Sequence, residues 1–195
     1  MTTTGARAVL LLSIMAGAAQ PASAADRLRF VLDPARTTIR FELPAFLHTV
    51  HGSFLLKRGT VELDAASGEA SGEIVVDLAG GQTGNASRDR RMHGEVLETA
   101  RYPEAALILH HVTGAVAPGG DSTIDMAAIL RLHGAEHAVT LPLKVHAESG
   151  EASVTGRFEV PYVSWGLKDP STTLLRVGKS VKVEIQARGR VEPAP

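Results

Sequence analysis

The sequence has 195 residues, a formal net charge of −1 at neutral pH and no cysteine. The near-neutral charge argues against a nucleic-acid partner, because nucleic-acid-binding proteins usually carry a basic face, and the lack of cysteine excludes disulfides and thiol nucleophiles. The fold must therefore depend on its hydrophobic core, and a chain of this length is suited to a single domain.

Residues 1–24 are typical of a secretory signal peptide. Arg7 supplies the positive end, an apolar run covers 8–19, and Ala22-Ser23-Ala24 offers small residues for cleavage. The apolar run is shorter than the roughly 20 residues that span a bilayer as a helix. We therefore expect export, cleavage near Ala24, one domain over 25–195, and no stable membrane span after cleavage.

Polar and apolar residues alternate through much of the remaining sequence. In Thr38–Leu43 the alternation places Ile39 and Phe41 on one face and Arg40 on the other. The predicted strands are 29–32, 38–43, 50–56, 60–64, 72–78, 105–116, 123–132, 138–146, 152–162 and 182–186. Turn signals separate them, at Lys57-Arg58-Gly59, Ser67-Gly68, Pro118–Asp121, His133-Gly134 and Ser149-Gly150. This pattern indicates a sandwich or a barrel, and a barrel of about eight strands has an interior that side chains fill or that holds one small ligand.

The stretch from Asn85 to Leu97 has helical spacing instead. Asn85 is the expected N-cap, since its side chain can accept a backbone N–H of the first turn. Met92, Val96 and, one turn earlier, Asp89 are expected to share a face. A second short helix is expected near 45–48.

Motifs for catalysis and metal binding are weak in this sequence. It contains no Gly-x-Ser-x-Gly, no HExxH and no P-loop pattern. His48, His51 and His93 could converge on a zinc ion, or His48 and His51 could simply hydrogen-bond the backbone or a ligand head group. The Arg88–Arg91 cluster has two readings that can both hold: an Arg–Asp pair clamping the helix to the barrel, or a cation at a pocket mouth for a phosphate or polar head.

A series of short motifs runs in a fixed order through nearly the whole sequence after the signal. They are Leu32-Asp33, Thr38–Phe41, Leu47–Phe54, Gly59, Val61–Asp64, Thr83–Asn85 with Arg88, Asp89 and Met92, Tyr102-Pro103, Leu132–Gly134 and Trp165–Leu167. Their order and spacing resemble the YceI-like family of bacterial periplasmic proteins. The His48/His51 pair is not general in that family, which leaves the chemistry of the head group open.

The resemblance implies an all-β fold: an extended antiparallel lipocalin-like barrel of about eight strands with one or two short capping helices. It also implies a periplasmic protein whose hydrophobic tunnel holds a polyisoprenoid or another long-chain amphiphile, without metal, cofactor or enzymatic activity. The ligand-binding residues it implies are Phe41, Phe46, His48, His51, Phe54, Arg88, Asp89, Met92 and Trp165. Two alternatives stay open, a metal-dependent enzyme using His48, His51 and His93, and a solid-core envelope stress protein. Homodimer formation also stays open.

Overall fold

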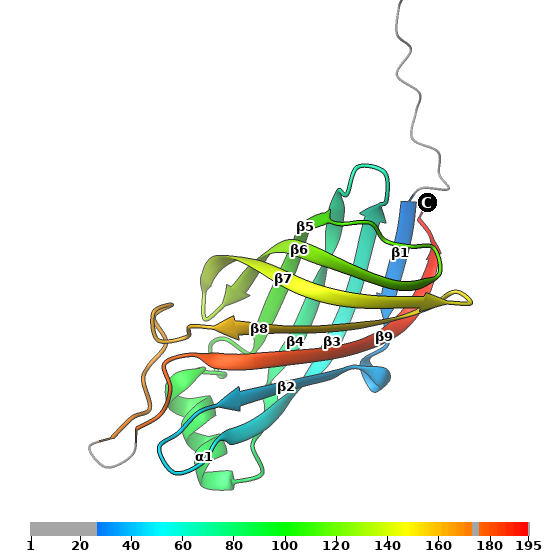
Figure 1. Cartoon of the computed structure of the whole chain (residues 1–195). Helices are drawn as coiled ribbons and strands as arrows, with labels where there is room; N and C mark the ends of the chain where they lie inside the picture. Colours follow the sequence, from blue (N-terminus) through cyan, green and yellow to red (C-terminus); the bar gives the residue numbers. More distant parts are fainter. Residues whose placement is uncertain (1–26, 173–175, 195) are drawn as a thin grey trace, which may run out of the picture.

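The computed structural model describes residues 27–172 and 176–194, so the predicted signal segment and its cleavage position lie outside the described residues. Nine antiparallel strands form one sheet (Figure 1). They are β1 (Arg27–Leu32), β2 (Thr38–Leu43), β3 (Val50–Asp64), β4 (Ala70–Gln82), β5 (Glu104–Thr113), β6 (Gly120–Leu132), β7 (Ala135–Glu148), β8 (Glu151–Val160) and β9 (Val181–Pro193). No helix within the described ranges is long and apolar enough to cross a membrane.

The sheet closes on itself into a barrel. β4 is the last strand in the order of the sheet, and its pairing with β3, near the other end of that order, closes the ring. β1 and β2 occupy one position in the wall, because both pair with β3 on one side and with β9 on the other. The ring therefore has eight positions, which confirms the predicted antiparallel barrel of about eight strands.

A short 3-10 turn over Pro34–Arg36 separates β1 from β2. Proline has no N–H to give to a strand ladder and fixes its own φ, so it interrupts the strand here. Asp33 caps the turn, because its carboxylate accepts the backbone N–H of Ala35 at 2.9 Å. The interruption places β1 beside the end of β3 and β2 beside its start.

The hairpin turns follow the sequence signals in most places, with one exception. At His133-Gly134 and Ser149-Gly150 both residues have positive φ, as the tight turns that match the twist of a hairpin require. The turn predicted at Lys57-Arg58-Gly59 is wrong, because β3 runs through it as a single 15-residue strand. The pairing of β3 with β4 shifts register between Leu56 and Arg58. This β-bulge bends the strand without ending it.

One helical segment lies at one end of the barrel (Figure 1). Helix α1 (Ala86–Arg91) continues into a π-helical turn, η3 (Met92–Val96). The predicted N-cap is confirmed: the Asn85 side chain accepts the backbone N–H groups of Ser87 and Arg88 at 3.1 and 3.0 Å. We call this end of the barrel the α1 end, and the opposite end, near the β5–β6 connection, the far end.

The second helix predicted near 45–48 does not form. Ala45 instead makes an isolated β-bridge with Val177. The backbone N–H of Phe46 donates to the carbonyl oxygen of Arg176 at 2.9 Å. These pairings to a distant segment take the backbone groups that a helical turn would have used.

Candidate ligand-binding cavity

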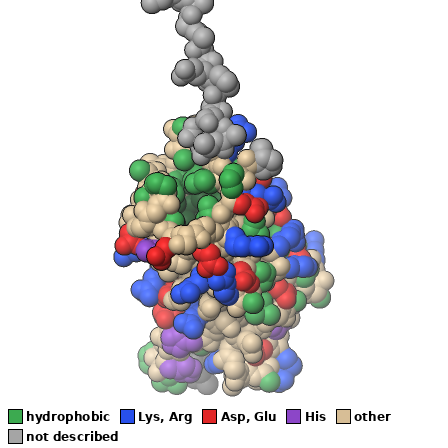
Figure 2. All heavy atoms as spheres, turned by 90° about the vertical axis from the view of Figure 1, so that its right-hand side faces the viewer, with side chains coloured by type: hydrophobic (Ala, Val, Ile, Leu, Met, Phe, Trp, Pro, Cys, Tyr) green, Lys and Arg blue, Asp and Glu red, His purple; other side chains and the backbone are tan. Residues whose placement is uncertain are grey.

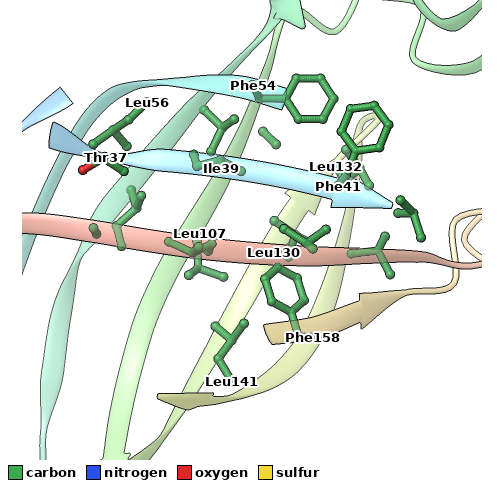
Figure 3. A pocket seen from close by; sticks show the side chains of 18 of the residues that line it. Thr37, Ile39, Phe41, Phe54, Leu56, Leu107, Leu130, Leu132, Leu141 and Phe158 are labelled. Carbon is green, nitrogen blue, oxygen red and sulfur yellow. The ribbon is translucent and has the colours of Figure 1, made fainter. Parts of the chain in front are cut away.

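The barrel encloses a cavity of about 700 Å³. This volume falls in the range of about 300–1,000 Å³ that is usual for small-molecule sites. Figure 3 shows side chains from several strands pointing into it, among them Ile39, Leu107 and Phe158. The interior is therefore hollow, which contradicts the alternative of a solid core.

The cavity wall follows from the alternation of the strands. In β2, Ile39 and Phe41 are buried and line the cavity, whereas Arg40 between them is exposed. Small inward residues leave room: Ala152 and Ala187 line the cavity and are nearly fully buried. The sequence has only five phenylalanines, so aliphatic and alanine side chains line most of the interior without filling it.

Polar lining is concentrated at the α1 end. His48 from the β2–β3 loop and Arg88 and Arg91 from α1 contribute to the wall, together with Thr83, Asn85 and Ser87. Tyr162 also lines this end, and its hydroxyl donates to the carbonyl oxygen of Gly178 at 2.8 Å. Burial, with the charge of Asp169, raises the pKa of Tyr162 to about 12, so the phenol stays neutral.

Thr83 anchors the start of α1 through two charged neighbours. The guanidinium of Arg88 donates from Nε to Thr83 Oγ1 at 2.8 Å and from Nη2 to Thr83 O at 3.0 Å. Asp89 Oδ1 accepts from the backbone N–H of Thr83 at 2.9 Å and from its hydroxyl at 2.5 Å. Arg88 and Asp89 thus clamp the helix to the end of β4 through Thr83, and Arg88 also lines the cavity.

Arg91 is held less firmly than Arg88. Its Nε lies 3.7 Å from Glu95 Oε2, whereas Lys168 Nζ lies 2.8 Å from the same oxygen. Lys168 accounts for most of the lowering of the Glu95 pKa, with a smaller contribution from Arg91. Since Lys168 is the main partner of this carboxylate, the Arg91 guanidinium can turn to a ligand on the cavity side.

Five of the nine predicted site residues line the cavity. They are Phe41, His48, Phe54, Arg88 and Met92. Phe41 and Phe54 stack on each other with ring centroids 5.1 Å apart, on neighbouring strands. Val96 also lines the cavity, as its expected position on the Met92 face of the helix requires.

The other four predicted residues, Phe46, His51, Asp89 and Trp165, do not line the cavity. His51 pairs in the ladder with Glu42, an outward position of β2, so its ring is exposed and lies 3.6 Å from the Glu42 carboxylate. The Phe46 ring is 78% exposed on the β2–β3 loop. Strand alternation sends His51 to the outer face, and Phe46 follows the bridge between Ala45 and Val177, so the structure places neither residue with the cavity-lining group.

Asp89 and Trp165 are held by protein contacts outside the cavity. Asp89 turns back to Thr83 and, with Arg90 and His93, lines a shallow depression on the outer side of the helix. It therefore does not share the inward face of Met92 and Val96. Trp165 stacks on His137 of β7 at 3.9 Å, with nearly parallel rings.

The three histidines considered for a metal site do not converge. His93 Nε2 is hydrogen-bonded to the Gly81 carbonyl oxygen at 2.8 Å, His51 faces outward, and His48 lines the cavity. Across residues 27–172 and 176–194, no group of three or more histidine, aspartate or glutamate side chains is placed to hold a metal ion. The alternative of an enzyme using this metal cluster therefore lacks its ligands.

The far end of the cavity was missed by the sequence analysis. Its wall consists of apolar side chains, and Figure 2 shows a hollow at this end bordered by hydrophobic groups. The lining residues here include Leu28, Leu63, Val116, Pro118, Val145 and Val191. Strand alternation could have identified several of them, since Leu28 and Phe30 continue the inward pattern of Leu32.

The fold and the site together define a lipocalin-like barrel with an internal apolar cavity. The family model of the YceI-like domain matches residues 30–188, and the chain belongs to this family. A UPF0312 protein of Pseudomonas savastanoi pv. phaseolicola is 31% identical over 133 residues, which cover 64% of this chain and 67% of that protein.

Two solved structures are similar in fold. One is a polyisoprenoid binding domain from Saccharophagus degradans implicated in plant cell wall breakdown, with a TM-score of 0.67 and 22% identity over 84% of this chain and 98% of that one. The other is BcnA of Burkholderia cenocepacia, with a TM-score of 0.65 and 16% identity over 81% of this chain and 99% of that one. Both support the extended barrel.

Proposed function

We propose that this protein is a periplasmic lipid-binding protein that holds a long-chain amphiphile, of polyisoprenoid or fatty-acyl type, inside the barrel. The observation that carries the proposal is the apolar cavity of about 700 Å³, whose arginine side chains and most other polar lining groups in the described chain lie at the α1 end. The polyisoprenoid binding domain of similar fold is consistent with this class of ligand. Export to the periplasm is supported by the signal-like pattern of residues 1–24.

Burial of the chain would provide most of the affinity. Each methylene removed from water contributes about 0.8 kcal/mol, so ten methylenes contribute about 8 kcal/mol before the costs of association. A single hydrogen bond to a charged group contributes about 1.5–3 kcal/mol. The length and shape of the cavity should therefore select the tail, and the polar end should select the head.

We place the head of the ligand at the α1 end. The permanently charged basic residues in the described lining are Arg88 and Arg91, and His48 lies at the same end. An anionic head, such as a carboxylate or a phosphate, would pair with these groups, whereas at the far end a charge would face only apolar side chains and solvent. The tail would then run toward Leu28 and Val116.

We infer a binding role in preference to a catalytic one. Thr83 Oγ1 is already engaged by Arg88 and Asp89, and no hydroxyl in the described lining is hydrogen-bonded to a histidine. A nucleophile of the serine or threonine type needs such a base within reach. The lining therefore supports retention of a ligand more than its chemical conversion.

Native mass spectrometry of protein purified from the cell envelope, with lipid extraction, tests the proposal. We expect a bound species with the mass of a long-chain lipid. Ala187→Phe, which places a ring in the middle of the cavity, should reduce the bound fraction, and Ala138→Phe, on an exposed position of β7, should not. Protein that is consistently free of lipid, or an Ala187→Phe variant that folds and carries as much lipid as the parent, would contradict the proposal.

N-terminal sequencing of the exported protein tests its location. We expect the mature chain to begin near Ala25 and to fractionate with the periplasm. An uncleaved chain in the cytoplasmic fraction would refute the export proposal while leaving the cavity argument intact.

A further inference from the structure

The β2–β3 loop exposes two adjacent large hydrophobic residues. Phe46 is 78% and Leu47 is 77% exposed, more than Leu55, the other large hydrophobic residue that stands out in the described chain at 58%. Isolated exposed hydrophobic residues are common on protein surfaces, but neighbouring ones at a loop tip often mark an interaction site. The function proposed above does not use either side chain.

The loop is held in place by backbone hydrogen bonds on both sides of its base. The Gly178 N–H donates to the Pro44 carbonyl oxygen at 2.7 Å, and the Phe46 N–H donates to the Arg176 carbonyl oxygen at 2.9 Å. Ala45 and Val177 form a β-bridge between these two bonds. The exposure of Phe46 therefore comes from a fixed backbone and leaves the ring directed away from the barrel.

This exposed pair lies at the rim of the cavity. Ala45 and His48, on either side of Phe46 and Leu47, both line the α1 end of the cavity, and so does Val177 opposite the loop. The pair therefore occupies the surface next to the polar end of the cavity.

Basic side chains accompany the pair. Arg176 and Lys179 are exposed, and neither has an ion pair within 4 Å among the residues that the structure describes. Hydrogen bonds from Ser171 contribute most to the lowering of the Asp169 pKa. The charges of Lys179 and Arg176 lower this pKa further. The Glu42 carboxylate lies 3.6 Å from the His51 ring. An apolar tip flanked by cations is complementary to a bilayer that contains anionic lipids.

We propose that the β2–β3 loop docks this protein on the surface of a lipid bilayer, with Phe46 and Leu47 inserted at the boundary between head groups and acyl chains. Arg176 and Lys179 lie against anionic head groups. Docking does not depend on the proposed cargo, but it would bring the polar end of the cavity to the membrane from which a lipid could enter.

Co-sedimentation of the mature protein with vesicles tests the docking surface. We expect binding to phosphatidylglycerol–phosphatidylethanolamine vesicles and weaker binding to phosphatidylcholine vesicles. Phe46→Ser and Leu47→Ser should each reduce the binding constant by roughly tenfold or more, because each removes a large apolar group from the membrane. Leu55→Ser, which changes an exposed leucine on the outer face of β3, should leave binding unchanged.

Charge variants separate the two parts of the surface. Arg176→Gln and Lys179→Gln should each weaken binding to the anionic vesicles several-fold and reduce the difference between the two vesicle types, and Arg190→Gln at the far end should not. Parental binding by Phe46→Ser and Leu47→Ser would overturn the proposal. So would a parent that does not bind vesicles but forms a dimer that the same variants disrupt, since the loop would then contact a second copy. Native mass spectrometry of the same variants shows whether a variant that no longer binds vesicles still contains bound lipid. This measurement separates the docking proposal from the proposed lipid-binding function.

Discussion

The two ends of the barrel differ in the chemistry of their walls. At the α1 end, the capped helix α1 brings Arg88 and Arg91 to the cavity, and the β2–β3 loop brings His48. At the far end the lining includes Leu28, Val116 and Val145. Figure 2 shows a hollow at this end with hydrophobic side chains around it. The strands between the ends contribute aliphatic side chains almost throughout.

This difference gives the cavity a direction. A charged head loses hydration when it enters a protein and needs a partner there, and an apolar tail needs none. Among the described lining residues, the arginines lie at the α1 end, so one orientation of an amphiphile is favoured over its reverse. An eight-stranded ring alone would not provide this preference, because the ladder of hydrogen bonds is similar at both ends.

The largest effect is expected from a charge in the wall near the α1 end. Phe41→Asp removes a buried ring that stacks on Phe54 and places a carboxylate in an apolar wall. We expect a loss of about 3 kcal/mol or more in the free energy of unfolding, and loss of bound lipid. Urea unfolding and native mass spectrometry measure the two effects.

Two matched variants sharpen this result. Val145→Asp, at the half-buried far rim, should cost less because water reaches the carboxylate. Leu55→Asp, on an exposed position, should stay within about 0.5 kcal/mol of the parent. Equal destabilisation by Phe41→Asp and Val145→Asp would show that the two ends do not differ in hydration.

The next largest effect is expected on the affinity for the polar head of the ligand. Arg91→Gln should weaken binding of a fatty acid by about tenfold, the size of one charge-assisted hydrogen bond. Binding of the fatty alcohol of equal length should not change. Titration calorimetry with both ligands measures the difference, and Arg90→Gln on the outer side of the helix is the control. An equal loss for acid and alcohol would mean that Arg91 only shapes the cavity.

A smaller effect should follow from loss of the helix cap. Asn85→Ala removes the acceptor for the N–H groups of Ser87 and Arg88 and should cost about 1 kcal/mol. Hydrogen exchange should accelerate in α1 and not in β7. Asn85→Asp keeps the acceptor and should behave as the parent, so faster exchange in both variants would contradict the role of the cap.

The smallest effect is expected on the outer surface near the far end. The hydrogen bond that the His146 ring donates to the Asp121 carboxylate, and then the charge of Asp121, raise the pKa of His146 above its usual value, with a smaller contribution from Glu148. The folded state thus binds this proton more tightly than the unfolded state. The stabilisation is complete below the unfolded pKa and is lost as the pH rises through the folded pKa.

Titration of the His146 ring by NMR measures this effect. Asp121→Asn should lower the pKa toward 6.5, the ordinary value for a histidine side chain. Glu148→Gln should lower it less, because its contribution is smaller. Binding of lipid should be the same in both variants, since His146 points outward. A pKa that does not move in Asp121→Asn would show that the pair does not form.

The parts of this fold that depend on local chemistry could be predicted from the sequence. Alternation located the strands, and Asn85 identified the start of α1. The turn that was predicted wrongly, at Lys57-Arg58-Gly59, depends on tertiary contacts. Gly59 follows two charged residues and resembles a turn residue, yet a side chain at this position would contact Leu32 at 3.2 Å, so the glycine allows β1 to approach the bulge.

The candidate site was harder to predict than the fold. His51 and Phe54 come from the same motif, but the pairing of His51 with Glu42 turns it outward, and register is a property of two strands together. The hollow itself depends on ring closure and on the summed volume of inward side chains, which no single motif encodes. The far rim combines residues as distant as Leu28 and Val191, so only the folded barrel brings it together.

The shared wall position of β1 and β2 has a consequence for folding. β1 pairs with β9, so the first and last strands of the described chain meet in the far wall. Contacts between residues so far apart in sequence close slowly, and the loop that they close includes almost the whole domain. A chain that emerges from its N-terminus therefore cannot complete its far wall until β9 has emerged, and until then Leu28 and Phe30 have no neighbour on one side. This interval is when the nascent protein is most exposed to aggregation and has most need of a chaperone.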